Sequence, residues 1–275
     1  MIKLELQKVS IAYGHNVVVR DITFQAIPGE MVGLIGPNGS GKSTIIKAIS
    51  RVISPCSGKI LLGGEDVSKI PRGDLARLLS VVPQIPLLPN AFTAFEIVLM
   101  GRNPHLGLLQ YEDARDLAIT WRAMERTVTH SLAGRRIDEL SGGEIQRLVI
   151  ARVLAQEPKS ILLDEPTANL DINHQVEILN LIKNLCLESN LTVVVVLHDL
   201  NLASQYCNRL ILLNNGQIHD QGIPSEVINS RNIKEVYGAE GCVYTHPANG
   251  LPTVLLKAGG NKHTNIGDTI ERGVV

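Results

Sequence analysis

The segment Gly36–Thr44 has the residue types and spacing of a loop that binds phosphate. It reads Gly-Pro-Asn-Gly-Ser-Gly-Lys-Ser-Thr and satisfies the pattern G-x-x-x-x-G-K-[ST]. Glycines let successive backbone N–H groups turn toward an anion, and a following helix adds the positive end of its dipole. The candidate phosphate-binding residues are Gly36, Pro37, Asn38, Gly39, Ser40, Gly41, Lys42, Ser43 and Thr44. The alternative is a glycine-rich turn with a chance lysine.

Within this loop, two side chains have specific expected partners. Lys42 is expected to reach the β- and γ-phosphates of a nucleotide, and the Ser43 hydroxyl to bind Mg²⁺.

Two carboxylates follow the apolar run Ile161–Leu163. Such a run predicts a buried parallel strand, and residues at the carboxyl end of that strand face the ligand crevice of an α/β sheet. We expect Asp164 to hold Mg²⁺ and Glu165 to orient or deprotonate an attacking water.

Two other polar side chains follow strand-like segments in the same way. Gln84 comes after the predicted strand 79–82, and His198 after the apolar segment 191–197. Gln84 is a candidate for contact with Mg²⁺ or the attacking water, against the alternative of a solvated loop residue. His198 is a candidate for sensing or stabilising a γ-phosphate.

A second anion site is predicted where a helix begins at residue 142. Ser141 and Glu144 form a capping box, and Gly142 and Gly143 leave backbone N–H groups uncovered in the first turn. The alternative is a well-capped helix with no ligand, but glycine weakens a first turn and capping does not explain two of them. Asp171 is expected to cap a later helix that ends near residue 187.

Tyr13 lies between two strand-like segments and shortly before the phosphate loop. A planar ring there could stack on a nucleotide base, and the alternative is an ordinary aromatic residue at a strand end.

The elements that must position these residues alternate between strand and helix. The pattern predicts β-structure over residues 2–28, strands at 31–35, 58–62, 79–82, 160–164 and 191–197, and helices at 42–50, 72–79 and from 142. Residues 90–140 have a helical pattern, with a capping box at Thr93 and Glu96. In this region we expect Trp121 to belong to the core and Gly101–His105 to form an exposed loop. The apolar face expected to pack contains Ala114, Leu117, Ala118, Trp121, Met124 and Val128.

Toward the end of the chain, Asn214-Asn215-Gly216 predicts a hairpin turn, and residues 244–256 predict a last β-element. Residues 259–275 are rich in Gly, Asn and Thr and are expected to be loose.

Composition excludes several classes of protein. The chain has 275 residues, is 44% hydrophobic and carries a net charge of −1 without a basic block, which disfavours nucleic acid as a partner. Its four cysteines have no C-x-x-C pair, which favours a reducing compartment. It has no signal peptide and no apolar stretch near the ~20 residues that span a bilayer, so we expect a cytoplasmic protein.

Taken together, the motifs resemble those of the ATPase subunits of ATP-binding cassette (ABC) transporters, in the family's order. The resemblance identifies Tyr13 as the adenine-stacking residue, Gly36–Thr44 as Walker A and Gln84 as the Q-loop. It identifies Leu140–Glu144 as the signature motif, Ile161–Glu165 as Walker B with the catalytic glutamate, Asn169–Asp171 as the D-loop and His198 as the switch histidine. One departure is Asn169, where the family commonly has Ser.

The resemblance implies a fold and a division of the chain. The fold is α/β, with a P-loop NTPase (RecA-like) core on a mainly parallel sheet, an antiparallel β subdomain and a helical subdomain that carries the signature. The ABC ATPase domain would span residues 1–230, with the helical subdomain at about 90–155, and residues 231–275 would form a C-terminal extension.

The resemblance also implies a mechanism with partners. Two copies close head to tail over two ATP molecules with Mg²⁺, so that Ser141, Gly142, Gly143 and Asp171 of one chain complete the site of the other. A membrane permease would dock near Gln84 and hold the dimer at the cytoplasmic face, with an external substrate-binding protein as an indirect partner.

Within the family, the segments Phe92–His105, Leu170–Gln175 and Thr245–Pro247 are similar to ATPases that power import of iron–siderophore complexes, haem or cobalamin. The alternatives are an ABC ATPase for another cargo or an ABC protein outside transport. A GTPase is disfavoured because Asn261–Thr264 lacks the aspartate of the guanine-binding motif, and an exporter half-molecule would carry its own membrane helices.

Overall fold

The structure is a computed structural model that describes residues 2–107 and 109–256. A six-stranded sheet forms the centre of the molecule. Its strand order is β10-β9-β3-β8-β7-β6, and all strands run parallel except the edge strand β10. The bounds are β3 Met31–Ile35, β6 Leu79–Val82, β7 Ser160–Asp164, β8 Thr192–Val196, β9 Arg209–Asn214 and β10 Gln217–Gly222. Every residue of β3, β7 and β8 is buried, as the apolar runs predicted.

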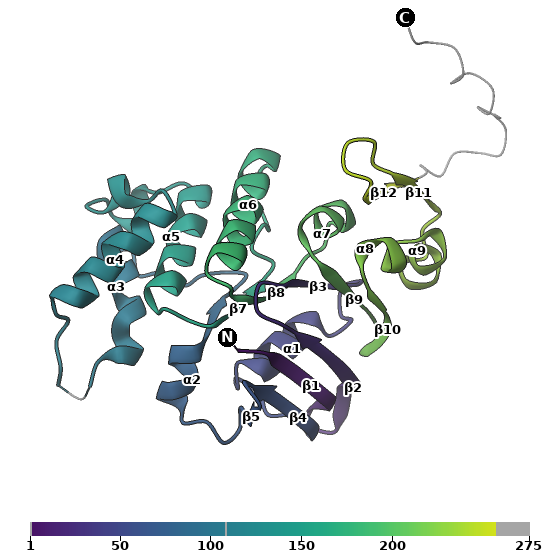
Figure 1. The fold of residues 1–275 in the computed structure, drawn as a ribbon, viewed down its shortest axis with the longest axis horizontal. Coiled ribbons are helices and arrows are strands. Elements are labelled where there is room, and N and C mark those ends of the chain that lie inside the picture. Colours follow the sequence, from purple (N-terminus) through teal and green to yellow (C-terminus); the bar gives the residue numbers. More distant parts are fainter. Residues whose placement is uncertain (1, 108, 257–275) are drawn as a thin grey trace, which may run out of the picture.

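The second layer is an antiparallel sheet of order β2-β1-β4-β5. Its strands are β1 Leu4–Tyr13, β2 Asn16–Ala26, β4 Ser57–Leu62 and β5 Glu65–Asp66. Helix α1 (Lys42–Ile49) lies between the two sheets, and its buried isoleucines share a core with both (Figure 1). The phosphate loop therefore ends in a helix that is fixed on two sides.

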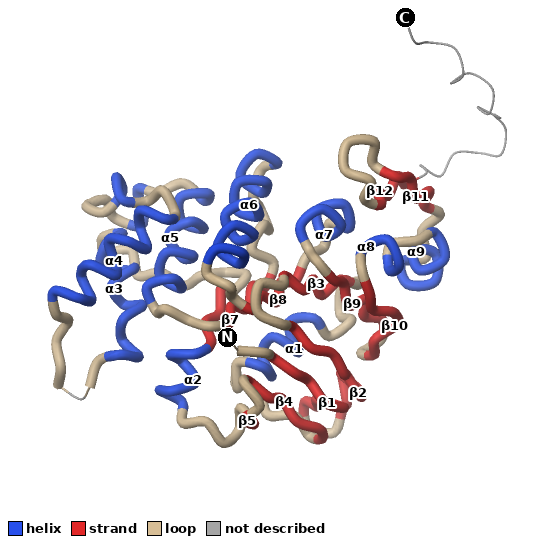
Figure 2. The backbone as a smooth tube through the Cα atoms, in the orientation of Figure 1, coloured by secondary structure: helices blue, strands red, loops and turns tan. Residues whose placement is uncertain are grey.

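Helices cover the other face of the six-stranded sheet. Figure 2 shows α5, α6 and α7 on one side of the strand row β7, β8, β3 and β9, opposite the antiparallel sheet. The helices of this layer are α5 Gly142–Ala155, α6 Ile172–Glu188, α7 Leu200–Tyr206, α8 Pro224–Val227 and α9 Ser230–Tyr237. This three-layer α/β arrangement confirms the predicted fold class.

A helical region packs around α5 and has its own core. Its elements are α3 Ala94–Leu99, α4 Ala114–Arg126 and the 3₁₀ helices η1 Met100–His105, η2 His130–Leu132 and η3 Ile137–Glu139. The capping box at Thr93 and Glu96 is present, so that prediction is confirmed. The short helix α2 (Arg72–Leu78) connects to β6 at the border of this region.

The predicted packing face of α4 is correct at Met124, which is buried, and wrong at its other members. Trp121 is 43% exposed, and Leu117 and Val128 are also exposed. The helix instead buries Asp116, Ile119, Thr120, Ala123 and Met124. Apolar spacing predicted a different face because it treats polar residues as exposed. Two polar residues of the buried face, Asp116 and Thr120, are instead satisfied by hydrogen bonds within the structure. The Thr120 hydroxyl donates to the Asp116 carbonyl at 2.8 Å, and Trp121 packs on Phe95 near the surface with ring centroids 4.8 Å apart.

The segment Gly101–His105 is not the exposed loop that we expected. It forms η1, in which Gly101 and Arg102 are buried. The Arg102 Nε donates to Asp116 Oδ1 at 2.8 Å, and its Nη1 donates to the Ala155 carbonyl and to Glu157. A buried ion pair thus ties η1 to α4 and to the end of α5.

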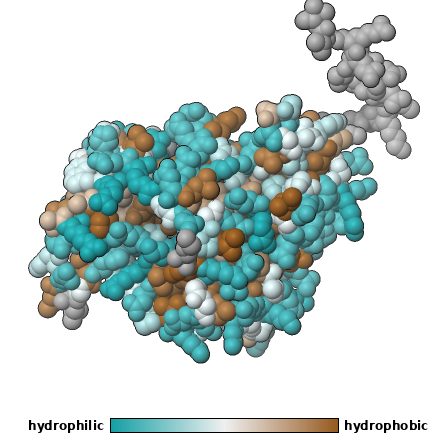
Figure 3. Space-filling view, in the orientation of Figure 1, coloured by the Kyte–Doolittle hydropathy of each residue, from teal (hydrophilic) through white to brown (hydrophobic). Residues whose placement is uncertain are grey.

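The last residues that the structure describes form a hairpin of β11 (Gly241–Thr245) and β12 (Pro252–Leu256), which confirms the predicted last β-element. The tail predicted to be loose from residue 259 lies outside the described residues. No helix in the described part of the chain combines the length and apolar character needed to cross a membrane. The face in Figure 3 is mainly hydrophilic, with apolar side chains in small groups.

Candidate functional site

The phosphate loop connects β3 to α1 and depends on glycine at two strained positions. Gly36 has φ 140°, and a Cβ there would lie 2.2 Å from the Leu213 carbonyl oxygen. Gly41, at the N-terminus of α1, has φ 102°. Because L-residues rarely adopt these angles, other residue types would distort the loop.

Lys42 folds back over this loop. Its ammonium group donates to the carbonyl oxygens of Gly36 and Pro37 at 2.8 and 2.9 Å, and the residue is buried. Burial lowers the pKa of Lys42, while the nearby carboxylates of Glu165 and Asp164 oppose the shift. The only positive side chain of the loop is therefore held where phosphates would lie.

The loop also contains a polar atom that fits a phosphate oxygen. The Ser40 Oγ is buried and has no hydrogen-bond partner among the described residues. An unmade bond at a buried hydroxyl costs about 1–3 kcal/mol, and a phosphate oxygen bound in the loop would supply the missing partner. The residues present thus fit a nucleotide phosphate.

A pair of oxygen ligands next to the loop fits Mg²⁺. The Ser43 hydroxyl donates to Asp164 Oδ1 at 2.9 Å, which joins the start of α1 to the end of β7. Burial raises the pKa of Asp164, although the hydrogen bond from Ser43 opposes this shift. Mg²⁺ prefers oxygen ligands and usually takes one or two from protein side chains, with water and phosphate supplying the others.

Glu165 is held between two predicted site residues. Gln84 Nε2 donates to Glu165 Oε2 at 2.7 Å, and His198 Nε2 lies 2.5 Å from Glu165 Oε1. Glu165 has φ 52°, a left-handed conformation that strains a non-glycine residue and is concentrated at functional sites. A cavity of about 160 Å³ adjoins Glu165 and His198, with Asn169 and Leu202 on its other walls. The ends of three adjacent strands therefore meet at one carboxylate.

The signature segment begins α5 with the expected geometry. Ser141 and Glu144 form the capping box, with the Ser141 hydroxyl 2.7 Å from the Glu144 carboxylate. A Cβ added to Gly142 or Gly143 would meet side-chain atoms of Leu170 or His174, on the segment that follows β7. Figure 1 shows α5 beside α3 and α4 and apart from α1.

The D-loop aspartate lies beside the signature. Asp171 caps α6 by accepting from the His174 backbone N–H at 2.9 Å, and its Oδ1 lies 2.8 Å from His174 Nδ1. Both bonds lower the pKa of Asp171, the backbone bond more strongly. A Cβ on Gly143 would lie 2.5 Å from the His174 ring, so this buried glycine has a packing role at the start of α5.

Tyr13 ends β1 opposite Asn16 and is 48% exposed. No described hydrogen bond joins it to the phosphate loop. A half-exposed ring leaves one face open to a ligand, and its predicted stacking role stays a prediction.

Three residues near the site were missed at the sequence level. His174 contacts the signature glycine, Asn201 binds the C-terminal hairpin, and Tyr237 of α9 reaches Gly36. Burial raises the pKa of Tyr237 to about 12, and a hydrogen bond from the Gly36 backbone opposes this. None of the three belongs to a nucleotide-binding motif, and only His174 lies in a segment named above, Leu170–Gln175.

Comparisons with known proteins agree with this geometry. Residues 19–168 match the sequence pattern of the ABC transporter family. The chain is 39% identical over 86% of its length to the cobalamin import ATP-binding protein BtuD of Halobacterium salinarum, and it spans 59% of that protein. It is 37% identical to the ferric enterobactin transport ATP-binding protein FepC of Escherichia coli K12, over 92% of this chain and 93% of that protein.

Solved structures show the same fold. A chain of an ABC transporter in an inward-facing conformation superposes with a TM-score of 0.81 and 27% identity, over 94% of this chain and 99% of that one. The family pattern covers more than half of the chain, and the relatives align over most of it. The chain therefore belongs to the ABC transporter family.

Proposed function

We propose that this chain is the ATP-hydrolysing subunit of an importer for an iron–siderophore, haem or cobalamin-type compound. The observation that carries the proposal is the Glu165 carboxylate, held by Gln84 and His198 beside Lys42 and Asp164. A carboxylate next to a phosphate site is the group needed to activate water. The alternatives are an ABC ATPase for another cargo or one outside transport.

The chain's own residues divide the work of hydrolysis. The backbone N–H groups of Gly39–Thr44, the Ser40 hydroxyl and the Lys42 ammonium bind the phosphates of ATP. Ser43, Asp164 and Gln84 would hold Mg²⁺, which would supply neutralisation of the phosphate charge. Glu165 accepts the proton of the attacking water, and His198 holds that carboxylate in place and contacts the γ-phosphate.

A second copy of the chain completes each site. Ser141 and Gly142 are exposed at the start of α5, and a Cβ added to Gly142 or Gly143 would meet Leu170 or His174 and no atom of the phosphate loop. A helix N-terminus binds a phosphate only when the phosphate reaches it. In a head-to-tail dimer the partner's γ-phosphate does so, and Asp171 lies at the same interface.

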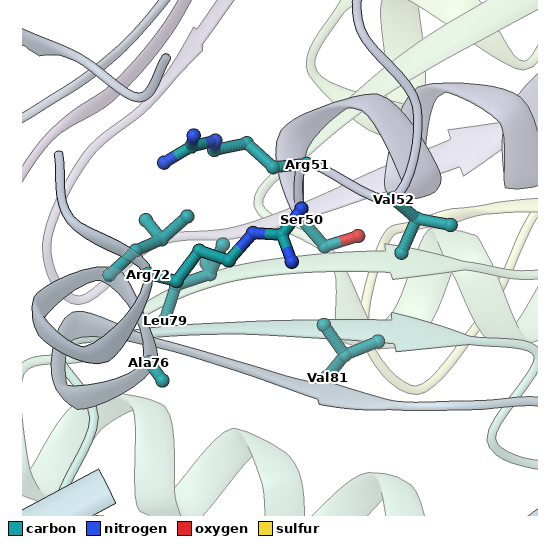
Figure 4. A pocket seen from close by; sticks show the side chains of 8 residues that line it. Ser50, Arg51, Val52, Arg72, Ala76, Leu79 and Val81 are labelled. Atoms are coloured by element: carbon teal, nitrogen blue, oxygen red, sulfur yellow. The ribbon is translucent and has the colours of Figure 1, made fainter. Parts of the chain in front are cut away.

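A groove at the end of α1 supports docking of a membrane permease. The groove is a cavity of about 430 Å³ between the end of α1, α2 and β6. In Figure 4 the Arg51 side chain extends from the end of α1 toward α2, and the Arg72 side chain extends from α2 toward Ser50. The apolar lining of the groove comes from Val52, Leu75, Ala76, Leu79 and Val81. Ile85 and Leu87, just after Gln84, are also strongly exposed. Exposed apolar surface of this kind marks protein contacts, and it would place the ATPase at the cytoplasmic face of the membrane.

The cargo assignment rests on the relatives. The two relatives described above are named for import of cobalamin and transport of ferric enterobactin, and a third, the iron(3+)-hydroxamate import ATP-binding protein FhuC of Bacillus subtilis, is 38% identical to this chain. Cargo passes through the permease and an external binding protein, so the ATPase itself needs no cargo pocket.

Uptake measurements test the proposal. A strain that lacks the gene for this chain should lose accumulation of one of three labelled compounds: a ferric siderophore, haem or cobalamin. The wild-type gene should restore uptake, and the Glu165→Gln variant should not. Normal uptake of all three, with loss of a sugar or an amino acid, would favour another cargo, and normal uptake of every compound would favour a role outside transport.

A further inference from the structure

The C-terminal hairpin is fastened to helix α7 by polar bonds. The Asn201 side-chain amide accepts from the Val254 N–H at 2.7 Å and donates to the Val254 carbonyl at 3.3 Å. The Ser204 hydroxyl, which is buried, donates to the Pro252 carbonyl at 2.8 Å. Val254 itself is buried in the hydrophobic core between the six-stranded sheet and the helices of the α5–α9 layer. One side chain thus pairs with both backbone groups of one residue in β12, as a neighbouring strand would.

Helix α7 begins directly after the switch histidine. Asp199 caps it by accepting from the N–H groups of Asn201 and Leu202 at 2.7 and 3.0 Å. On the other side of His198, the Leu197 N–H donates to the Leu34 carbonyl at 3.2 Å, which ties the end of β8 to β3. His198 therefore lies between a strand end fixed by the sheet and a helix start fixed by the hairpin.

The side chain of His198 is in direct contact with the Glu165 carboxylate. His198 Nε2 lies 2.5 Å from Glu165 Oε1, and Leu202 of α7 lines the cavity beside both residues. A shift of α7 by a fraction of an ångström would change both the contact and the cavity. A two-stranded hairpin is marginally stable alone, so β11–β12 depends on its contacts with α7 and α9, and the contact with α7 is made by β12.

We propose that the hairpin β11–β12 is a positioning element for hydrolysis, which acts through Asn201 and Ser204 on α7 and thereby fixes His198 against Glu165. This inference rests on the proposed role of His198. Asn201 and Ser204 are positioning residues, because they touch the hairpin and not the reacting atoms.

The test compares Asn201→Ala with Asn249→Ala. Asn249 lies in the turn of the same hairpin and bonds only to Leu251 among the described residues, so its loss should not move α7. In the full-length chain with MgATP, Asn201→Ala should lower kcat about tenfold, within the ~10²-fold that misplaced catalytic groups cost. The KM for ATP should change less than about twofold, because the phosphate loop is untouched. Asn249→Ala should match the wild type.

A double-mutant cycle separates positioning from general damage. In a His198→Ala background, Asn201→Ala should lower kcat by less than about twofold, since the positioned group is already gone. An equal loss of kcat in both backgrounds would overturn the proposal. Ser204→Ala, which removes one bond and one atom, should lower kcat in the same direction, and full activity in this variant and in a folded Asn201→Ala would also overturn it.

The two levels of the proposal fail in different ways. If His198→Ala hydrolyses ATP at the wild-type rate, the proposed role of His198 is wrong and the hairpin has no catalytic group to position. If His198→Ala is strongly impaired but Asn201→Ala is not, the hairpin inference alone is wrong.

Discussion

Gln84 and Glu165 are joined by a 2.7 Å hydrogen bond from Nε2 to Oε2, although 81 positions separate them in the chain. The bond exists because β6 and β7 are parallel neighbours, so the residues that follow them emerge side by side. Gln84 also lies just before the exposed apolar residues Ile85 and Leu87, which are candidates for contact with a permease. A movement of the Gln84 loop would therefore act directly on the carboxylate.

The Glu165→Gln variant should bind MgATP but hydrolyse it about 10²–10⁴-fold more slowly, because the amide keeps the size of the side chain and loses its basicity. ATP binding and phosphate release measured on the same preparation would show the separation. The matched control is Glu188→Gln, which changes an exposed carboxylate paired with Arg126 at the surface. Near-normal turnover by Glu165→Gln would remove Glu165 from the role of base.

Tyr13→Ala should raise the KM for ATP more than it changes kcat, because stacking on a base contributes about 1–3 kcal/mol to binding and does not act on the γ-phosphate. Tyr13→Phe keeps the ring and should resemble the wild type. GTP should be hydrolysed within about tenfold of ATP, since every base has a π-face. Steady-state kinetics with both nucleotides check this, and an unchanged KM in Tyr13→Ala would make the tyrosine an ordinary strand-end residue.

The sequence was sufficient to predict the strands, the phosphate loop, the caps at Thr93, Ser141 and Asp171, and the fold class. These features follow from local patterns: buried parallel strands are continuous apolar runs, and caps depend on residues three positions apart. For the same reason, the polar residues after β6, β7 and β8 could be assigned to one edge of the sheet.

Local patterns failed where partners are distant in sequence. Arg102 is buried because Asp116 and Glu157 meet it, and Trp121 is exposed because Asp116 and Thr120 occupy the buried face of α4. Neither outcome is visible in apolar spacing, which counts a buried polar residue as surface. The bonds of Asn201 to Val254 likewise depend on a hairpin that returns 53 residues later.

Asp116→Asn should destabilise the fold by about 3 kcal/mol at neutral pH, because it removes one partner of a buried charge, with Glu157 left to compensate in part. Burial alone would raise the pKa of Asp116, but hydrogen bonds from Arg102 and the Asp113 backbone and the charge of Arg102 together lower it. The stabilisation that the ionised Asp116 carboxylate gives the folded state is therefore complete above the unfolded-state pKa of about 4. It is lost as the pH falls further toward the folded-state pKa.

Urea unfolding from neutral pH down to pH 3 measures this difference between wild type and Asp116→Asn. The control is Glu235→Gln, which breaks exposed pairs with Arg231 and His219 and should change the free energy of unfolding far less than Asp116→Asn. A difference for Asp116→Asn that is equally small at neutral pH would contradict the account of η1 as a segment fixed by the ion pair.

Gly143→Ala should lower ATPase activity about 10²-fold although alanine is the better helix former by about 1 kcal/mol, because the added Cβ meets the His174 ring and displaces the signature. The double variant Gly143→Ala with His174→Ala removes the clash and should recover much of the lost activity. Gly73→Ala is the matched control: Gly73 is also the second residue of a helix, and its Cβ would meet none of the described atoms within 4 Å.

The central claim is that each active site is shared between two chains, and mixing two inactive variants tests it most directly. Lys42→Ala should abolish hydrolysis by removing the phosphate-binding ammonium, and Ser141→Arg by filling the space where the partner's phosphate would lie. A heterodimer of the two has one site with both lesions and one site with neither. Activity should therefore reappear on mixing, up to half of the wild-type value per heterodimer if the sites act independently. Cross-linked heterodimers that form in good yield and remain as inactive as their parents, or a Ser141→Arg homodimer with full activity, would contradict the shared site.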